Sequence, residues 1–148
     1  MKAPQQILVP TDFSTYAEKA LQEGLFLAKQ FNARLHLLHV VEDIQQCAAD
    51  YCLREEFVQQ YRTSGIENSQ QKLKSELEKY PEAKEVQVTT NVRVGRPEDE
   101  ILKEEKEKNI DLIVIASHGR TGFLQYLMGS VAERVSRGAK CEVMLVKS

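Results

Sequence analysis

The sequence has little of the material that several classes of protein require. Its 148 residues contain no tryptophan and only three cysteines, which form no CxxC pair, so a disulfide scaffold is excluded. Its apolar runs are too short to cross a membrane, and residues 1–6 and the short run after them lack the apolar core of a signal peptide. We therefore expect a cytoplasmic protein with no membrane partner.

Neither sign of charge is in large surplus. The chain has 20 Lys+Arg against 22 Asp+Glu, a net charge of −2, which argues against a nucleic-acid partner or an anionic membrane surface because both require a basic excess. The charge is unevenly divided: residues 1–116 hold 15 basic and 20 acidic side chains, and residues 117–148 hold 5 and 2. This positive excess in the last quarter suits a small anionic ligand.

The length and the composition indicate one ordinary globular domain over residues 1–148. Apolar residues make up 42% and charged residues 28%, and a chain of about 150 residues buries a core without metal or disulfide support. Five short apolar runs, rich in β-branched residues, predict the strands of a parallel sheet that is covered on both faces. They are Ile7–Val9, Leu35–Val41, Val86–Val94, Leu112–Ala116 and Val143–Val146.

Helical periodicity separates these runs. An apolar stripe predicts a first helix over Ser14–Phe31, with Thr15 and Glu18 as a capping box and Asn32 after its end. The next connection begins with a polar segment without periodicity, Glu42–Leu53.

A long helix follows that segment and should stop at Tyr80, before Pro81. A third helix opens at Pro97, and a fourth runs from about Gly129 to Arg137. Strands that alternate with helices predict an open, doubly wound α/β fold, whose ligands bind at the carboxyl ends of the strands.

Polar residues follow the first strand directly. Asp12, with the hydroxyls of Thr11 and Ser14, suits a ribose, an amide edge or a hydrated Mg²⁺. The alternative is that these side chains only cap the first helix.

A glycine-rich segment follows the fourth strand, from Ser117 to Gly122, and Gly129 and Ser130 open the last helix. Glycines allow close backbone approach, and a helix start offers N–H groups to an anion. The segment therefore suits a phosphate, although a purely structural connection would have the same composition.

Other candidate residues each have a structural alternative. His118 is either a general base or a residue that orients its loop, and we favour the second role. His36 and His39 should point to opposite faces of a strand, and a zinc site made from them with Cys47 and Cys52 matches no usual ligand spacing. We expect both of these cysteines at the edge of the connection that carries them.

Several further charged and polar positions are expected to be structural. Cys141 should be a small buried residue. Arg93 and Arg96 flank Gly95, and we favour solvated surface charges over contacts to a polyphosphate. The run from Glu98 to Lys108 predicts a solvent-facing helix with internal charge pairs.

Three segments of the chain resemble the universal stress protein family, and the resemblance covers essentially the whole sequence. They are Ile7-Leu8-Val9-Pro10-Thr11-Asp12-Phe13-Ser14, Val94-Gly95-Arg96-Pro97, and Asp111 through His118-Gly119-Arg120 and Gly129-Ser130 to Val146. Members that bind ATP carry G-x2-G-x9-G-[ST]. Here the register reads Ala116-x2-Gly119-x9-Gly129-Ser130, so that alanine replaces the first glycine.

The resemblance implies a strand order of 3-2-1-4-5, of the adenine-nucleotide alpha-hydrolase-like kind, and a site for ATP, ADP or AMP with Mg²⁺ as a companion. By similarity, Asp12 and the main chain around Val41 contact the adenosine. Gly119, Arg120, Gly129, Ser130 and Val131 hold the phosphates, and the remaining lining residues are Pro10, Thr11, Ala116 and His118.

The resemblance also implies a homodimer through the last strand, Cys141 to Lys147, whose apolar edge would otherwise stay unpaired. The expected role is a nucleotide-responsive stress factor with at most slow ATP hydrolysis. Two alternatives remain: a dimeric interaction module of the same fold that binds no nucleotide, and an ATP-using enzyme of adenylyl-transferring type, for which no second signature motif is found.

Overall fold

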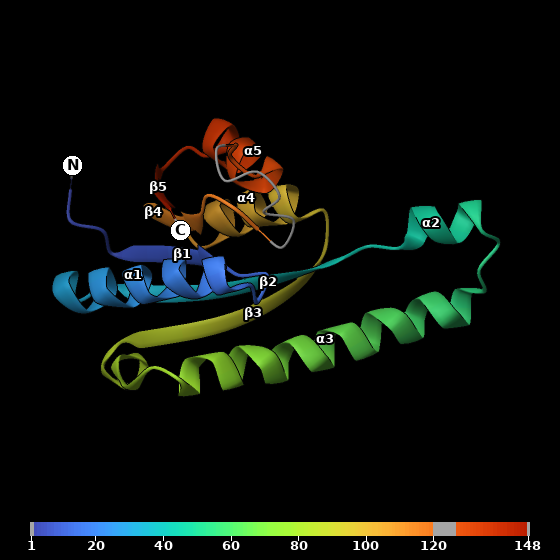
Figure 1. Cartoon of the computed structure of the whole chain (residues 1–148), viewed down its shortest axis with the longest axis horizontal. Helices are drawn as coiled ribbons and strands as arrows, with labels where there is room; N and C mark the ends of the chain where they lie inside the picture. The colour runs from blue at the N-terminus through green and yellow to red at the C-terminus, as the bar shows by residue number, and fades with distance from the viewer. Residues whose placement is uncertain (1, 120–126, 148) are drawn as a thin grey trace.

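A computed structural model describes residues 2–119 and 127–147, and Figure 1 shows its arrangement. Five parallel strands form one sheet in the order β3-β2-β1-β4-β5, which confirms the expected fold. The elements in chain order are β1 (Gln6–Pro10), α1 (Thr15–Phe31), β2 (Arg34–Glu42), α2 (Gln45–Asp50), α3 (Glu55–Glu78), η1 (Pro81–Glu85), β3 (Gln87–Gly95), α4 (Pro97–Glu107), β4 (Leu112–Ala116), α5 (Ser130–Gly138) and β5 (Glu142–Val146).

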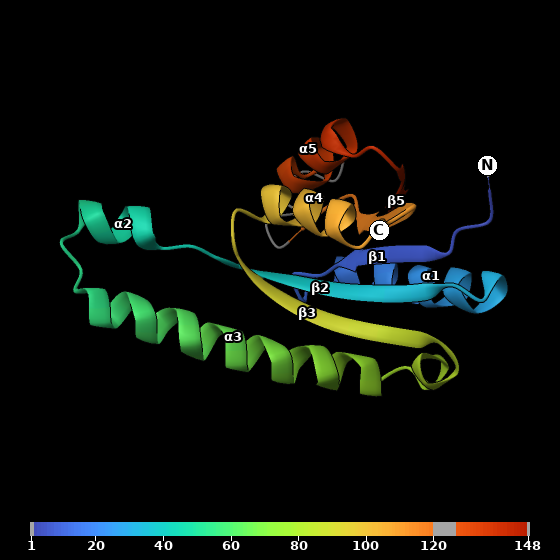
Figure 2. The same cartoon turned by 180° about the vertical axis from the view of Figure 1, so that it is seen from behind.

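Helices cover both faces of the sheet, with α1 in front of it in Figure 1 and behind it in Figure 2. Successive residues of each strand point to opposite faces, and they form two apolar clusters. Ile7 and Val9 pack with α1 and with Leu73 of α3, whereas Leu8 packs with residues of α4 and α5 such as Ile101. The α5 and α3 helices therefore lie on opposite faces.

The start of helix α1 differs from the expected capping box. The cap is Ser14, whose side-chain oxygen accepts the N–H of Ala17 at 3.2 Å, and Thr15 is already helical. The expectation failed because the backbone of Ser14 is still extended, which is the conformation that an N-cap requires. At the other end Asn32 adopts a left-handed conformation with φ of 53°, as expected for a helix end.

The segment expected to be an irregular connection contains the short helix α2. It has six residues and no apolar stripe, so periodicity gave no signal for it. The first half of α3 and helix α2 project beyond the ends of the strands (Figure 1). Helix α3 itself ends at Glu78, two residues before the predicted end, and Tyr80 precedes the short helix η1 instead.

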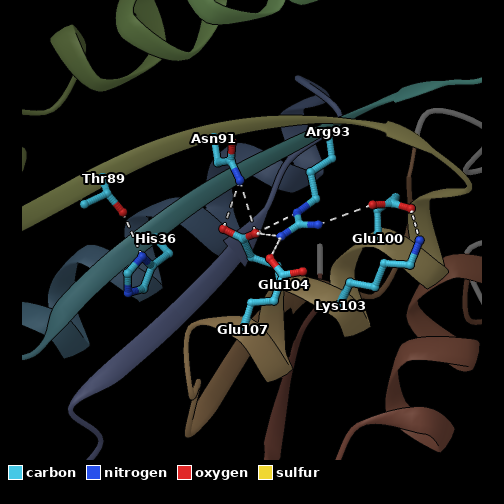
Figure 3. Close-up of polar contacts among 8 residues, drawn as sticks. All are labelled: His36, Thr89, Asn91, Arg93, Glu100, Lys103, Glu104 and Glu107. Carbon is cyan, nitrogen blue, oxygen red and sulfur yellow. Dashed lines mark hydrogen bonds and ion pairs between the residues drawn. The ribbon is translucent and has the colours of Figure 1, made fainter.

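Helix α4 carries buried acids, so the prediction of a solvent-facing helix was wrong, although Glu100 and Lys103 form the expected kind of internal charge pair at 2.7 Å. Glu104 is only 1% exposed. Its carboxylate forms an ion pair with the Arg93 guanidinium at 2.6 Å and accepts a hydrogen bond from the Asn91 amide at 3.1 Å (Figure 3). Arg93 also pairs with Glu107 and lies 3.5 Å from Glu100. The expectation that Arg93 is solvated is corrected too, because its side chain is only 16% exposed.

The three cysteines lie in different surroundings. Cys47, in helix α2, and Cys52, just after it, are exposed on the projecting segment. Cys141 is partly buried, and burial, helped by the neighbouring Glu105 carboxylate, raises the pKa of its thiol to about 12. Within the described part of the chain, no helix is long and apolar enough to span a membrane.

Candidate functional site

A cavity of about 620 Å³ opens at the carboxyl ends of β1, β2 and β4. Strands β1 and β4 pair at their amino ends, Ile7 with Leu112 and Leu8 with Ile113, and the cavity lies beyond these pairs. This is where the strand order reverses, the usual ligand position in such sheets. The described residues that line it include Pro10, Thr11, Asp12, Val41, Ala116, His118, Gly119, Gly129, Ser130 and Val131.

The cavity therefore brings together all the site residues expected from the sequence except Arg120, which lies outside the described residues. Its volume falls within the range of about 300–1,000 Å³ that is usual for small-molecule sites. These residues come from the ends of β1, β2 and β4 and from the start of α5.

Local hydrogen bonds order the loop between β1 and α1. The N–H of Thr11 donates to the carbonyl of Leu38 at 2.8 Å, and the Thr11 hydroxyl oxygen accepts the N–H of Phe13 at 3.0 Å. The Asp12 carboxylate accepts the N–H of Ser14 at 3.0 Å. Phe13 has a φ of 62°, a left-handed conformation that is costly for a bulky residue. Asp12 therefore orders this turn, and the helix cap is left to Ser14.

Gly119 lies against Asp12 because it has no side chain. A Cβ built on Gly119 would stand 2.9 Å from the second carboxylate oxygen of Asp12, a distance that ordinary side chains do not reach. Two segments more than a hundred residues apart in the chain thus meet at the cavity. A side chain at position 119 would therefore have to displace the Asp12 carboxylate from its present position.

Gly129 holds the start of α5 against the end of β4. Its N–H donates to the carbonyl of Ser117 at 2.7 Å, and a Cβ on it would stand 3.3 Å from the same oxygen. Gly129 is the N-cap residue of α5, not its first helical residue as predicted, and no side chain caps the helix there. The first N–H groups of a helix have no acceptor within the helix and attract anions. Ser130 and Val131 place this helix start in the cavity wall.

His118 presents a buried polar atom in the same wall. Its Nδ1 lies 3.0 Å from the Ser117 hydroxyl, and its ring lies 6.0 Å from that of Tyr16. Its Nε2 is buried and has no hydrogen-bond partner among the described residues. Such an atom is costly unless something satisfies it, and a bound ligand would be able to do so.

Ala116 leaves the cavity open. It is 8% exposed and belongs to the apolar cluster that α1 covers. Its methyl group therefore packs largely with the core, and the volume of about 620 Å³ is measured with alanine in place.

Helix α3 contributes a wall that the sequence patterns did not reveal. Its cavity-facing residues follow helical spacing and are Tyr61, Gly65, Asn68, Ser69 and Lys72. Gly65 fits closely, since a Cβ on it would stand 3.2 Å from a methyl group of Val41. A small and polar stripe beside the apolar stripe of α3 was the available signal, but without the fold nothing related it to the strand ends.

His39 also lines the cavity and stabilises the loop after β1. Its Nδ1–H donates to the carbonyl of Thr11 at 2.7 Å, and its ring lies 4.4 Å from that of Phe13. Because a carbonyl only accepts, this bond places the proton on Nδ1. His36 lies on the other face, with Nε2 2.8 Å from the Gln6 amide oxygen and Nδ1 2.7 Å from the Thr89 hydroxyl.

These contacts do not favour the zinc hypothesis. Burial lowers the pKa of His36, and both of its ring nitrogens already have hydrogen-bond partners. Among residues 2–119 and 127–147, no group of three or more histidines, cysteines or carboxylates is placed to hold a metal ion.

An ion pair connects α4 to α5, the helix whose start lines the cavity. Glu98, near the start of α4, accepts hydrogen bonds from Arg134 of α5 and from Arg96, the latter at 2.9 Å. Burial opposes the charge of Glu98, but its own backbone N–H and the two arginines outweigh this effect and lower its pKa. The pair links α5 to the first turn of α4. Helix α4 also supplies Pro97 and Ile101 to the cavity lining.

Comparison with known proteins gives a consistent result over the whole chain. The model of the universal stress protein family matches residues 4–147. Universal stress protein YxiE of Bacillus subtilis is 34% identical over 146 residues, which cover 96% of this chain and 98% of YxiE. The solved structure of MJ0577 from Methanocaldococcus jannaschii has a TM-score of 0.85 and 28% identity, and the match covers 99% of this chain and 98% of that one.

Two other solved universal stress proteins share the fold and were determined with nucleotides. One is a complex with cAMP, with a TM-score of 0.67 and 23% identity over 98% of each chain. The other, from Archaeoglobus fulgidus, is a complex with dAMP, with a TM-score of 0.68 and 19% identity over 99% of this chain and 100% of that one.

Proposed function

We propose that this chain, which belongs to the universal stress protein family, binds an adenine nucleotide in the cavity at the carboxyl ends of β1, β2 and β4. One observation carries the proposal: the contact of Gly119 with Asp12 and the bond from Gly129 to Ser117 place a carboxylate and an uncapped helix start around one cavity. These are complementary to the hydroxyls of a ribose and to a phosphate, respectively.

In this arrangement the adenosine contacts Asp12 and the main chain at Val41. The phosphates lie at Gly119 and at the N–H groups and the hydroxyl that begin α5, and Arg120 is proposed beside them. The buried Nε2 of His118 needs a partner, which a nucleotide oxygen or nitrogen supplies. That proteins of this fold have been solved with cAMP and with dAMP supports an adenine nucleotide as the ligand class.

Mg²⁺ fits the proposed site as a companion of the phosphates. Asp12 is the carboxylate beside Gly119, and Mg²⁺ is usually bound by one or two carboxylates together with phosphate oxygens and water. When bound, the ion neutralises phosphate charge. The described lining has no phosphate-loop lysine and no arginine, so we propose nucleotide binding with at most slow hydrolysis.

We also propose that β5 forms the interface of a homodimer. This strand is at an edge of the sheet, and Met144 and Leu145 are each 37% exposed. The unpaired backbone groups of an edge strand are a template for pairing with another chain. The same observation is what favours the second candidate function, a dimeric interaction module that binds no nucleotide.

The experiment that separates the two candidates begins with denaturation of the purified protein and mass spectrometry of what it releases. The protein freed of nucleotide is then titrated with ATP, ADP and AMP, with and without Mg²⁺, by calorimetry. Saturable binding of one nucleotide per chain supports the proposal. A dimer that releases no nucleotide and shows no saturable binding would instead favour the interaction module.

Replacing Gly119 by alanine tests the contact with Asp12. The added methyl group meets the Asp12 carboxylate at 2.9 Å and must displace it, which removes a charged hydrogen bond to the ribose. We expect about tenfold weaker ATP binding and a free energy of unfolding within about 1 kcal/mol of the wild type, as measured by calorimetry and urea unfolding.

Gly138→Ala provides the matched control for this variant. A Cβ there meets a methyl group of Leu102 at 2.7 Å, and neither residue lines the cavity. Its ATP affinity should equal that of the wild type. If Gly119→Ala also binds ATP with wild-type affinity, Asp12 does not contact the nucleotide in the way proposed.

A further inference from the structure

Lys72 is the one lysine or arginine among the described residues that line the cavity. It lies on helix α3, and its ammonium nitrogen stands 5.4 Å from the centre of the Phe13 ring. No hydrogen bond or ion pair joins this ammonium to another described residue. The universal stress protein motif lies in other segments of the chain and includes no residue of α3.

The position of Lys72 is fixed by its neighbours. Ser69 and Leu73, on either side of it in α3, are 6% and 0% exposed, so this part of the helix is anchored to the sheet. The Phe13 ring also contacts His39, at 4.4 Å between ring centres. A lysine over an aromatic ring gains a modest cation–π attraction, and this holds the ammonium beside the residue that follows Asp12.

The charges of the lining show what Lys72 can contribute. The described lining contains two carboxylates, Asp12 and Glu42, which repel a phosphate. Two features of the cavity carry positive charge and offset these carboxylates. They are the start of α5 on one face of the sheet and Lys72 on the other. A nucleotide that lies across the strand ends is therefore approached by positive charge from both faces.

We propose that Lys72 makes the cavity selective for the number of phosphate charges, so that its contribution to affinity increases from AMP to ADP to ATP and is absent for adenosine. This inference rests on the proposed nucleotide binding and assigns to α3 a part in it. The ammonium acts through its charge, so salt weakens its contribution.

The test compares the wild type with Lys72→Met and Lys72→Arg. Dissociation constants for adenosine, AMP, ADP and ATP are measured by calorimetry at about 0.05 M and about 0.5 M salt. Lys72→Met should weaken ATP binding about tenfold at low salt, with smaller losses for ADP and AMP and none for adenosine. Lys72→Arg should restore most of the affinity, because it keeps the charge.

Lys74→Met is the matched control, because Lys74 is two residues further along the same helix and lines a separate hollow beside β3. Its affinities should equal those of the wild type. Equal losses for all four ligands in Lys72→Met would mean that the side chain only packs, and no loss would mean that it does not meet the ligand. Either result overturns this inference, whereas a wild type that binds none of the four ligands overturns the proposed function itself.

Discussion

Replacing Gly129 by aspartate is expected to weaken ATP binding at least about 100-fold. The carboxylate would stand at the start of α5, where the phosphates are proposed to lie. Two like charges about 4 Å apart repel by about 4 kcal/mol at the effective dielectric constant near a protein surface. Aspartate is also a favourable N-cap residue, so α5 should remain helical. Calorimetric titration with ATP measures the loss, and thermal unfolding checks the fold.

Gly129→Asn separates charge from size, because asparagine has the same shape without the charge. The new Cβ, 3.3 Å from the Ser117 carbonyl oxygen, is common to both variants. We therefore expect Gly129→Asn to bind ATP at least about tenfold more tightly than Gly129→Asp. Equal affinities would attribute the loss to crowding alone. Wild-type affinity in the aspartate variant would place the phosphates elsewhere.

Replacing Arg93 by methionine is expected to lower the free energy of unfolding by about 3–5 kcal/mol, the usual effect of breaking a buried ion pair. Glu104 would keep only the Asn91 amide, at 3.1 and 3.3 Å, as a partner among those shown in Figure 3. Because Glu104 is 1% exposed, the variant would leave a buried carboxylate without its cationic partner. Urea unfolding followed by circular dichroism measures the change.

Lys103→Met is the control for this variant, because it also removes one cation from the same cluster. Lys103 pairs with Glu100 at 2.7 Å, but its side chain is 60% exposed, and exposed pairs contribute about 1 kcal/mol or less. If Arg93→Met lowers the free energy of unfolding by less than about 1 kcal/mol, Arg93 and Glu104 do not behave as a buried ion pair. The distinction matters for the site, since α4 supplies Pro97 and Ile101 to the cavity.

The sheet could be predicted from the sequence because strands that are buried on both faces consist of short apolar runs rich in β-branched residues. The predicted runs match β1 to β5 to within one residue at each end. Helix α2 has no such pattern, since its sequence of six polar and small residues contains no apolar stripe. The buried acids of α4 were misread because Glu104 is charged, and only the tertiary structure shows that Arg93 of β3 reaches it.

Only those parts of the candidate site could be predicted whose residue types are themselves unusual in the sequence. The glycines at positions 119 and 129 and the acid at position 12 stand out as residues with special backbone or charge properties. The α3 wall does not, because Asn68 and Lys72 are common on any exposed helix. Their position at the strand ends follows from the packing of Leu73 into the core, which depends on residues far away in the chain.

The central claim is that an adenine nucleotide binds where β1, β2 and β4 end, and amide chemical shifts of ¹⁵N-labelled protein titrated with ATP and Mg²⁺ test it most directly. We expect the largest shifts at Asp12, Val41, Gly119 and the first turn of α5. The hollow beside β3, lined by Leu73 and Thr90 among others, offers a second location of similar size. Shifts confined to that hollow, or the absence of shifts, would contradict the account.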